Sequence, residues 1–404
     1  MSEPQSTCPR CRCAHIILAL VLGLGLALPL AVAAWHTVAR EWKACRQVSQ
    51  WKQRGDAAFL AGDFATAART YSRAQAIDPT ALDLLPLFAR ARAFDAAWHP
   101  DTLQGDYVAD VAVDVDSVEA AFPADKPTLT ALRGFVAIQA GRTSDGEALV
   151  RKALELDPAN GPANLGLAHI LRRDPGKMKE TVAAMEAAIK AGPKVPENLA
   201  LLGRILLDQG DVKGATDRLT ESVALRETAD SLRDLGTALL AGNDLPGAIK
   251  RLGDSARLND RAATTWSLLS QAYLMDEAFD SAETAARTSL AIQQAPATTI
   301  RLAQALNRQK RFGEAAQLLQ QTLQSQRDLV TLIEFASALE GLNRTNDALT
   351  IYREILSSQW PRDPQQSRLV QQIQSIALQH VQALNPAAPA VPAAPGPAKK
   401  GAKR

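Results

Sequence analysis

Thiols and imidazoles are the side chains best suited to hold a metal ion, and four of them gather near the N-terminus of this 404-residue chain. They are Cys8, Cys11, Cys13 and His15. Thiolates and imidazoles are zinc ligands, and a C-x2-C spacing is half of a zinc site. A closed structural site takes four ligands on a folded hairpin, and no second ligand pair follows nearby. We therefore expect no bound metal here and interpret residues 1–13 as a tail with reactive thiols.

Residues for catalysis are scarce in the rest of the sequence. The other histidines, His36, His99, His169 and His380, are far apart, and no two histidines stand four residues apart. Neither a phosphate-binding G-x-x-x-x-G-K-[ST] loop nor a G-x-S-x-G nucleophile turn occurs. Aromatic residues make up only 5% of the chain, which favours interdigitating helices over an aromatic-lined pocket. We predict that the protein is not an enzyme and binds no cofactor.

The charge distribution argues against nucleic acid as a partner. Lys and Arg number 45 against 43 Asp and Glu, and residues 55–385 carry a net charge of −7 between two basic ends. An acidic body does not attract polyphosphate along its length. Four cysteines are also too few for a disulfide framework in a chain of this length.

A long uncharged segment near the N-terminus predicts a membrane span. No formally charged residue occurs in residues 14–39, and about 20 apolar residues suffice for a helix to cross the bilayer. Trp35, Arg40 and Trp42 follow as interfacial anchors. The alternative is a signal peptide cleaved near Ala33, which would release a soluble exported binding protein.

The flanks of this segment bear on its orientation and pairing. Basic residues lie on both sides, with a slight preference for a cytoplasmic N-terminus and a periplasmic body. We therefore expect a single-pass protein of a bacterial inner membrane, the bacterial origin being inferred from composition. Ala19, Gly23, Ala27 and Ala31 recur every four residues, a small-residue stripe that could pair two such helices in a homodimer.

The body of the chain repeats with a period of 33 or 34 residues. One series of small residues at this spacing comprises Gly203, Gly236, Ser270, Ala303 and Ala336, and a second comprises Ala215, Ala248, Ala282, Ala315 and Ala348. Apolar residues flank each series at helical spacing. We predict pairs of helices in which a small residue on the first helix admits a large residue from the second.

These repeats resemble the tetratricopeptide repeat (TPR), a helix–turn–helix unit of 34 residues. The clearest single match contains Trp51, Gly55, Ala67, Tyr71 and Pro79. The resemblance covers eight units, at residues 48–79 and 127–361, and implies an all-α, right-handed α-solenoid. It also implies protein or peptide partners in a concave groove lined by the first helices.

The chain from residue 14 onward divides into six segments. We expect a transmembrane helix with an interfacial extension at 14–39, a juxtamembrane helix with the first repeat at 40–79, a degenerate repeat with an acidic insertion at 80–126, seven repeats at 127–361, a capping helix at 362–385 and a disordered Ala/Pro-rich basic tail at 386–404. In the 80–126 segment, Val111, Val113 and Val115 alternate with other residues, and we expect no regular second helix there.

Function follows from the implied groove. Its predicted polar lining is Arg204, Arg233, Thr237, Ser267, Gln271, Arg301, Gln304 and Arg308. The Lys and Asn set with which some members of the family hold a C-terminal carboxylate is missing. We predict a membrane-tethered scaffold or assembly factor that binds proteins. The alternative is a non-catalytic accessory subunit of a bacterial envelope biosynthesis or secretion complex.

Overall fold

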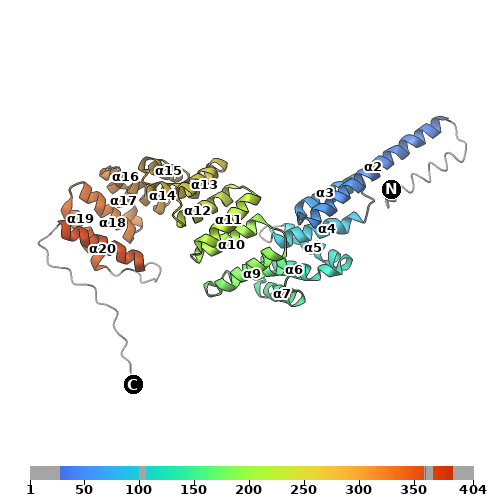
Figure 1. The fold of residues 1–404 in the computed structure, drawn as a ribbon, viewed down its shortest axis with the longest axis horizontal. Helices are drawn as coiled ribbons and strands as arrows, with labels where there is room; N and C mark the ends of the chain where they lie inside the picture. Colours follow the sequence, from blue (N-terminus) through green and yellow to red (C-terminus); the bar gives the residue numbers. More distant parts are fainter. Residues whose placement is uncertain (1–27, 100–105, 359, 361–366, 385–404) are drawn as a thin grey trace, which may run out of the picture. The chain divides into compact units, whose positions relative to one another are not determined.

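Helices account for all the regular structure in the computed structural model, which describes residues 28–99, 106–358, 360 and 367–384. The chain forms two compact units, residues 1–222 and 223–404, which are described separately. Figure 1 shows the helices in chain order as antiparallel pairs. The predicted all-helical repeat array is confirmed for these residues.

The first unit contains α2 (Leu28–Leu60), α3 (Phe64–Ile77), α4 (Leu84–Trp98), α5 (Asp106–Ala121), α6 (Lys126–Gln139), α7 (Thr143–Leu156), α8 (Gly161–Leu171), α9 (Met178–Ala191), α10 (Pro196–Asp208) and most of α11 (Val212–Leu225). Two short 3-10 turns, η2 (Pro123–Asp125) and η3 (Pro175–Lys177), precede α6 and α9.

The second unit contains α12 (Ala229–Ala241), α13 (Leu245–Leu258), α14 (Ala263–Met275), α15 (Phe279–Ile292), α16 (Pro296–Arg308), α17 (Phe312–Ser325), α18 (Leu329–Gly341), α19 (Thr345–Ser357) and α20 (Ser367–Leu384).

The predicted fit of small against large residues is confirmed within the helix pairs. All ten residues of the two series are buried. A Cβ atom on Gly203 would lie 2.6 Å from Cγ of Leu219, and one on Gly236 would lie 2.6 Å from Cγ of Leu252. Each leucine thus occupies the space that the missing side chain leaves, which lets the two helices approach closely.

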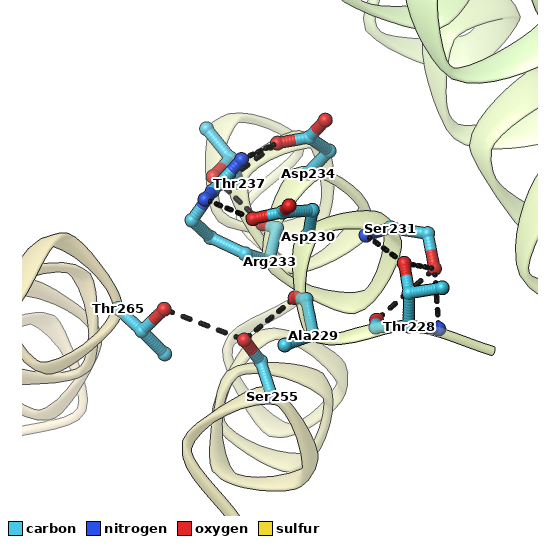
Figure 2. Close-up of polar contacts among 9 residues, drawn as sticks. All are labelled: Thr228, Ala229, Asp230, Ser231, Arg233, Asp234, Thr237, Ser255 and Thr265. Atoms are coloured by element: carbon cyan, nitrogen blue, oxygen red, sulfur yellow. Dashed lines mark hydrogen bonds and ion pairs between the residues drawn. The ribbon is translucent and has the colours of Figure 1, made fainter. Parts of the chain in front are cut away.

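Buried serines tie the second helix of three pairs to the start of the first. The Oγ atoms of Ser222, Ser255 and Ser289 donate to the carbonyl oxygen of the residue 26 positions earlier, at 2.7, 2.7 and 2.8 Å. Figure 2 shows this contact for Ser255, which also lies 3.3 Å from the hydroxyl of Thr265 on α14. These bonds satisfy the buried serine hydroxyls inside an otherwise apolar seam.

Residues 80–126 differ from the expectation. The segment contains two helices, α4 and α5, so the interpretation that it lacks a regular second helix was wrong. Val111, Val115 and Val118 are buried, and their spacing of four and three residues is that of one helix face. The alternation that suggested a different pattern arose because the sequence also has a valine at position 113.

The first unit makes contacts that a simple nearest-neighbour array does not. The buried ring of Trp98, at the end of α4, fills the space beside Gly161 and Gly192, where a Cβ atom would come within 2.2 and 2.0 Å of its ring. Phe64 and Val195 complete this cluster. The beginning and the end of the unit are thus packed together across about 100 residues of sequence.

Helix α20 covers the end of the second unit. Its buried residues Ile373, Ala377 and Val381 join the apolar cluster of α18 and α19, as a terminal cap of a solenoid should. Nδ1 of His380 lies 2.8 Å from Oε2 of Glu340 on α18. Residues 362–366 and 385 of the predicted capping helix fall outside the described residues.

The predicted membrane span is described only from Leu28 onward, as the beginning of α2. Within the described part of the chain, no helix combines the length and the hydropathy that crossing a bilayer requires. Residues 14–27, including Ala19, Gly23 and Ala27 of the predicted dimer stripe, lie outside it. The fourth stripe residue, Ala31, belongs to α2.

Candidate partner-binding surface

Seven of the eight predicted groove residues lie on the first helices of the second unit. Arg233 and Thr237 are on α12, Ser267 and Gln271 are on α14, and Arg301, Gln304 and Arg308 are on α16. The eighth residue, Arg204, is exposed on α10 of the first unit.

The charge of Arg233 is compensated by two carboxylates of its own helix, α12. Its guanidinium donates to Oδ1 of Asp230 at 2.7 Å and to Oδ1 of Asp234 at 2.9 Å, as Figure 2 shows. Burial disfavours the charged guanidinium, but these two carboxylates outweigh that effect and raise the pKa of Arg233. Thr237 donates back to the carbonyl of Arg233 at 2.9 Å. Neither residue offers the partner an uncompensated charge.

Three predicted residues meet between α14 and α16. Arg301 donates from Nη1 to Oγ of Ser267 at 2.9 Å and from Nη2 to Oε1 of Gln271 at 3.0 Å. Ser267 also hydrogen-bonds Thr298 at 2.7 Å. The sequence placed these side chains on one face, and the structure brings them into direct contact.

Arg301 has different partners from three other partly buried arginines. Arg133, Arg233 and Arg311 each pair with a carboxylate. Arg301 has only the neutral acceptors of Ser267 and Gln271 and pairs with no acidic residue in the described part of the chain. Burial therefore acts unopposed and lowers its pKa, although a guanidinium remains charged at neutral pH.

A hollow of about 410 Å³ opens beside Arg301. Helices α14 and α16 and the beginning of α18 form its walls, with Gln271, Leu274, Met275, Ala297, Ile300, Arg301, Gln304, Gln326, Asp328 and Val330 as lining residues. The carboxylate of Asp328 is already occupied, because it accepts from the backbone N–H groups of Val330 and Thr331 at 3.0 Å. A guanidinium with unused donors thus stands in a hollow lined by both apolar and polar side chains.

Glu334, which accepts hydrogen bonds from two residues of α16, was not predicted from the sequence. Gln304 donates to Oε1 of Glu334 at 3.0 Å, and Asn307 donates to the Glu334 carbonyl at 3.1 Å. Glu334 stands one repeat after Arg301, at 33 residues' separation, so the repeat register was a signal that could have found it. Arg308 is exposed at the end of α16 and does not line the hollow.

A second hollow, of about 400 Å³, lies between α15, the start of α16 and α17. Its lining residues are Leu290, Gln294, Ala295, Pro296, Thr299, Leu318, Gln321, Thr322 and Ser325. None of them is charged, so it lacks a group that would orient a polar ligand. The hollow at Arg301 is therefore the better candidate.

Metal-binding groups do not contribute to this surface. Among the residues that the structure describes, no three His, Cys, Asp or Glu side chains gather as a metal site requires. The sequence candidates Cys8, Cys11, Cys13 and His15 all fall outside these residues.

Comparison with known proteins identifies the repeats. Two family models, both described as tetratricopeptide repeat, match residues 233–297 and 297–330, the stretch that contains α14, α16 and the hollow. Residues 233–330 of this chain belong to the tetratricopeptide repeat family. TPR domains in general bind proteins or peptides. No curated protein matches the chain.

Several solved structures are similar to this chain. The APC/C hetero-tetramer Cut9–Hcn1 is 21% identical with a TM-score of 0.46; the match covers 71% of this TPR chain and 54% of that one, so our chain spans about half its length. PilF of Pseudomonas aeruginosa is 19% identical with a TM-score of 0.44, covering 52% and 96%. A tetratricopeptide repeat protein of Parabacteroides merdae is 12% identical with a TM-score of 0.48, covering 63% and 99%.

Proposed function

We propose that this TPR protein is a membrane-tethered scaffold or assembly factor that holds a protein partner at the hollow beside Arg301. The observation that carries the proposal is the charge of Arg301, which is partly buried, bonds only the neutral side chains of Ser267 and Gln271, and has no carboxylate partner in the described residues. Such a group costs free energy unless a partner supplies the missing acceptors.

The geometry indicates how a partner would be recognised. Leu274, Met275, Ile300 and Val330 offer apolar contact, while Arg301 and Gln304 supply donors at the edge. A few polar groups in a mainly apolar concavity fix the orientation of a ligand. No set of side chains in the described residues suggests catalysis, and the binding of partners is the general role of TPR proteins.

The membrane tether rests on the sequence. The uncharged residues 14–39 support it, with α2 continuing past Ala39 into the first repeat. We place the repeats on the periplasmic side of a bacterial inner membrane, on the slight charge preference of the flanks.

Site-specific photo-crosslinking in native membranes tests the proposal. A photoreactive amino acid at Gln304, on the wall of the hollow, should give a discrete adduct with one partner protein. The same amino acid at Gln320, exposed on α17, is the control and should not give that adduct. Equal labelling of the same protein from both positions, or no adduct from Gln304, would rule out a binding site at the hollow.

A further inference from the structure

The exposed charged residues of the first helix pair are all basic, while Glu41 and Asp56 on α2 are half-buried. The exposed basic residues of α2 and α3 are Arg40, Lys43, Arg46, Arg54, Arg69 and Arg73, here called the basic surface. Among the side chains described on these two helices, no exposed residue is acidic. This contrasts with the body of the chain, whose net charge is negative.

The cations of the basic surface have no carboxylate partners among the described residues. None of the six forms an ion pair with a described residue, whereas the neighbouring Lys52 pairs with Asp83 at 2.7 Å. Elsewhere, exposed arginines commonly have a carboxylate partner, as Arg327 and Arg344 do. The basic surface therefore keeps its full charge for an external partner.

Two tryptophans hold the guanidinium groups in place. Arg54 and Arg73 both stack on Trp51, with 4.9 and 5.2 Å from guanidinium carbon to ring centroid, and Arg46 stacks on Trp42 at 5.6 Å. A stacked guanidinium keeps its N–H edge free, and that planar edge matches a carboxylate in a two-bond contact. Five of the six basic residues are arginines, as such recognition favours.

We propose that the basic surface binds an acidic polypeptide segment of a partner protein, separately from the hollow at Arg301. The chain's own ends do not supply this segment, because residues 386–404 contain four basic and no acidic residues and residues 1–27 contain only Glu3 as an acid. The surface extends along α2 from Arg40 to Arg54, about 21 Å at 1.5 Å per residue. That length suits a peptide lying along the helix.

A lipid surface and nucleic acid fit these observations less well. If residues 14–39 span the bilayer as proposed, α2 leaves the membrane near Arg40 and carries Arg54 about 21 Å along its axis. Ionic screening reaches only about 8 Å at physiological salt, so headgroups would attract one end of the surface. Polyphosphate would extend beyond the surface onto an acidic body.

Binding of a dye-labelled oligoglutamate to the purified full-length chain tests this inference. The triple variant Arg46→Gln, Arg54→Gln, Arg73→Gln should lose about tenfold to a hundredfold in affinity, since each exposed ion pair contributes a factor of roughly two to five. The matched control is Lys179→Gln, Lys213→Gln, Lys250→Gln, which removes three exposed charges elsewhere. It should bind nearly as the parent does. The variant Arg46→Lys, Arg54→Lys, Arg73→Lys retains the charge and should recover part of the affinity.

Carbodiimide coupling locates the bound peptide, because it joins a carboxylate to an amine only in direct contact. Lys43 should be coupled more than Lys179, Lys213 or Lys250, and coupling should fall when salt is raised. Equal affinity loss in the two triple glutamine variants, or no preference for Lys43, would overturn the inference. Stronger protection of Lys43 by phosphatidylglycerol vesicles or oligothymidylate than by oligoglutamate would also overturn it. None of these results depends on whether a partner occupies the hollow at Arg301.

Discussion

Arg233 and Arg301 both lie on first helices of the second unit, but their charges are compensated differently. Acidic residues stand three before and one after Arg233, and both bind it. No acidic residue occurs between positions 297 and 305 around Arg301. The presence or absence of nearby acidic residues in the sequence therefore separates a structural arginine from one available to a partner. Both residues were assigned to the groove from the sequence without this distinction.

The long-range partners of these residues could not be predicted as readily. Asp328 lines the hollow because the turn before α18 approaches α16, and its carboxylate is used as an N-cap. A sequence pattern indicates which face of a helix a residue occupies, but not which turn closes over that face.

Substitution by alanine should have opposite effects on stability at two glycines of the α12–α13 pair. Gly236→Ala should lower the free energy of unfolding by about 1–3 kcal/mol, because its Cβ would overlap Leu252. Gly253→Ala on α13, where a new Cβ meets nothing within 4 Å, should raise it by roughly 0.5–1 kcal/mol through lower chain entropy. Thermal melts of the two variants measure these changes in stability. If both variants shift the melting temperature in the same direction, the seam between α12 and α13 is placed wrongly.

Glu283 should contribute stability that depends on pH. Burial alone would raise its pKa, but hydrogen bonds from Arg287, Arg311 and Gln309 hold the pKa below its ordinary value of 4.5. A carboxylate with a lowered pKa in the folded state stabilises above the unfolded value, and that contribution is lost as the pH falls through the folded value. The melting temperature of the parent should therefore exceed that of Glu283→Gln at neutral pH.

This difference should close as the pH falls below 4.5. The exposed Glu155, substituted in the same way, provides the control and should melt like the parent over the whole range. A gap between Glu283→Gln and the parent that is unchanged in acid would show that the ion pairs around Glu283 do not stabilise the fold.

At the scale of elements, the helix pairs of the second unit followed the sequence register closely. The two 33-to-34-residue series correctly placed the seam residues of α12 to α19 because each pair repeats the same local packing. Helix α5 was missed although Val111, Val115 and Val118 form a helical stripe. The alternation at Val113 and the missing repeat consensus suggested that no second helix forms here, but neither feature excludes a helix.

The packing of Trp98 was beyond sequence reasoning, because nothing near residue 98 indicates contact with Gly161 and Gly192. It makes the first unit respond to mutation over a long range. Trp98→Ala should cost about 3–5 kcal/mol, as removal of a buried aromatic ring does. Hydrogen exchange should accelerate both in the α2–α3 turn and around Val195, which belong to the same cluster.

Trp266→Ala in the second unit is the matched control. Its ring is only partly buried, and its indole N–H donates to the nearby carbonyl of Asp260 at 2.8 Å. Exchange should change only in α14 and its neighbours. If Trp98→Ala likewise affects only α4 and adjacent helices, the first unit is an ordinary nearest-neighbour array.

At the scale of the whole molecule, the proposed tether predicts how the chain fractionates. The full chain should remain with membranes after an alkaline carbonate wash, because a helix inserted through residues 14–39 is held by the hydrophobic effect and not by charge. Release of the intact chain into the supernatant, or a mature N-terminus near Ala34, would contradict the tether.

Whether the hollow at Arg301 binds a protein partner is decided by the dissociation constant of the partner captured from Gln304. Arg301→Gln should weaken binding by about tenfold to a hundredfold, because hydrogen bonds to a charged group contribute roughly 1.5–3 kcal/mol. Arg308→Gln, the same change at an exposed position on α16, should bind like the parent, and both variants should retain the parent's helical circular dichroism. If Arg301→Gln binds like the parent, or if the two variants lose the same affinity, the hollow at Arg301 does not bind the partner.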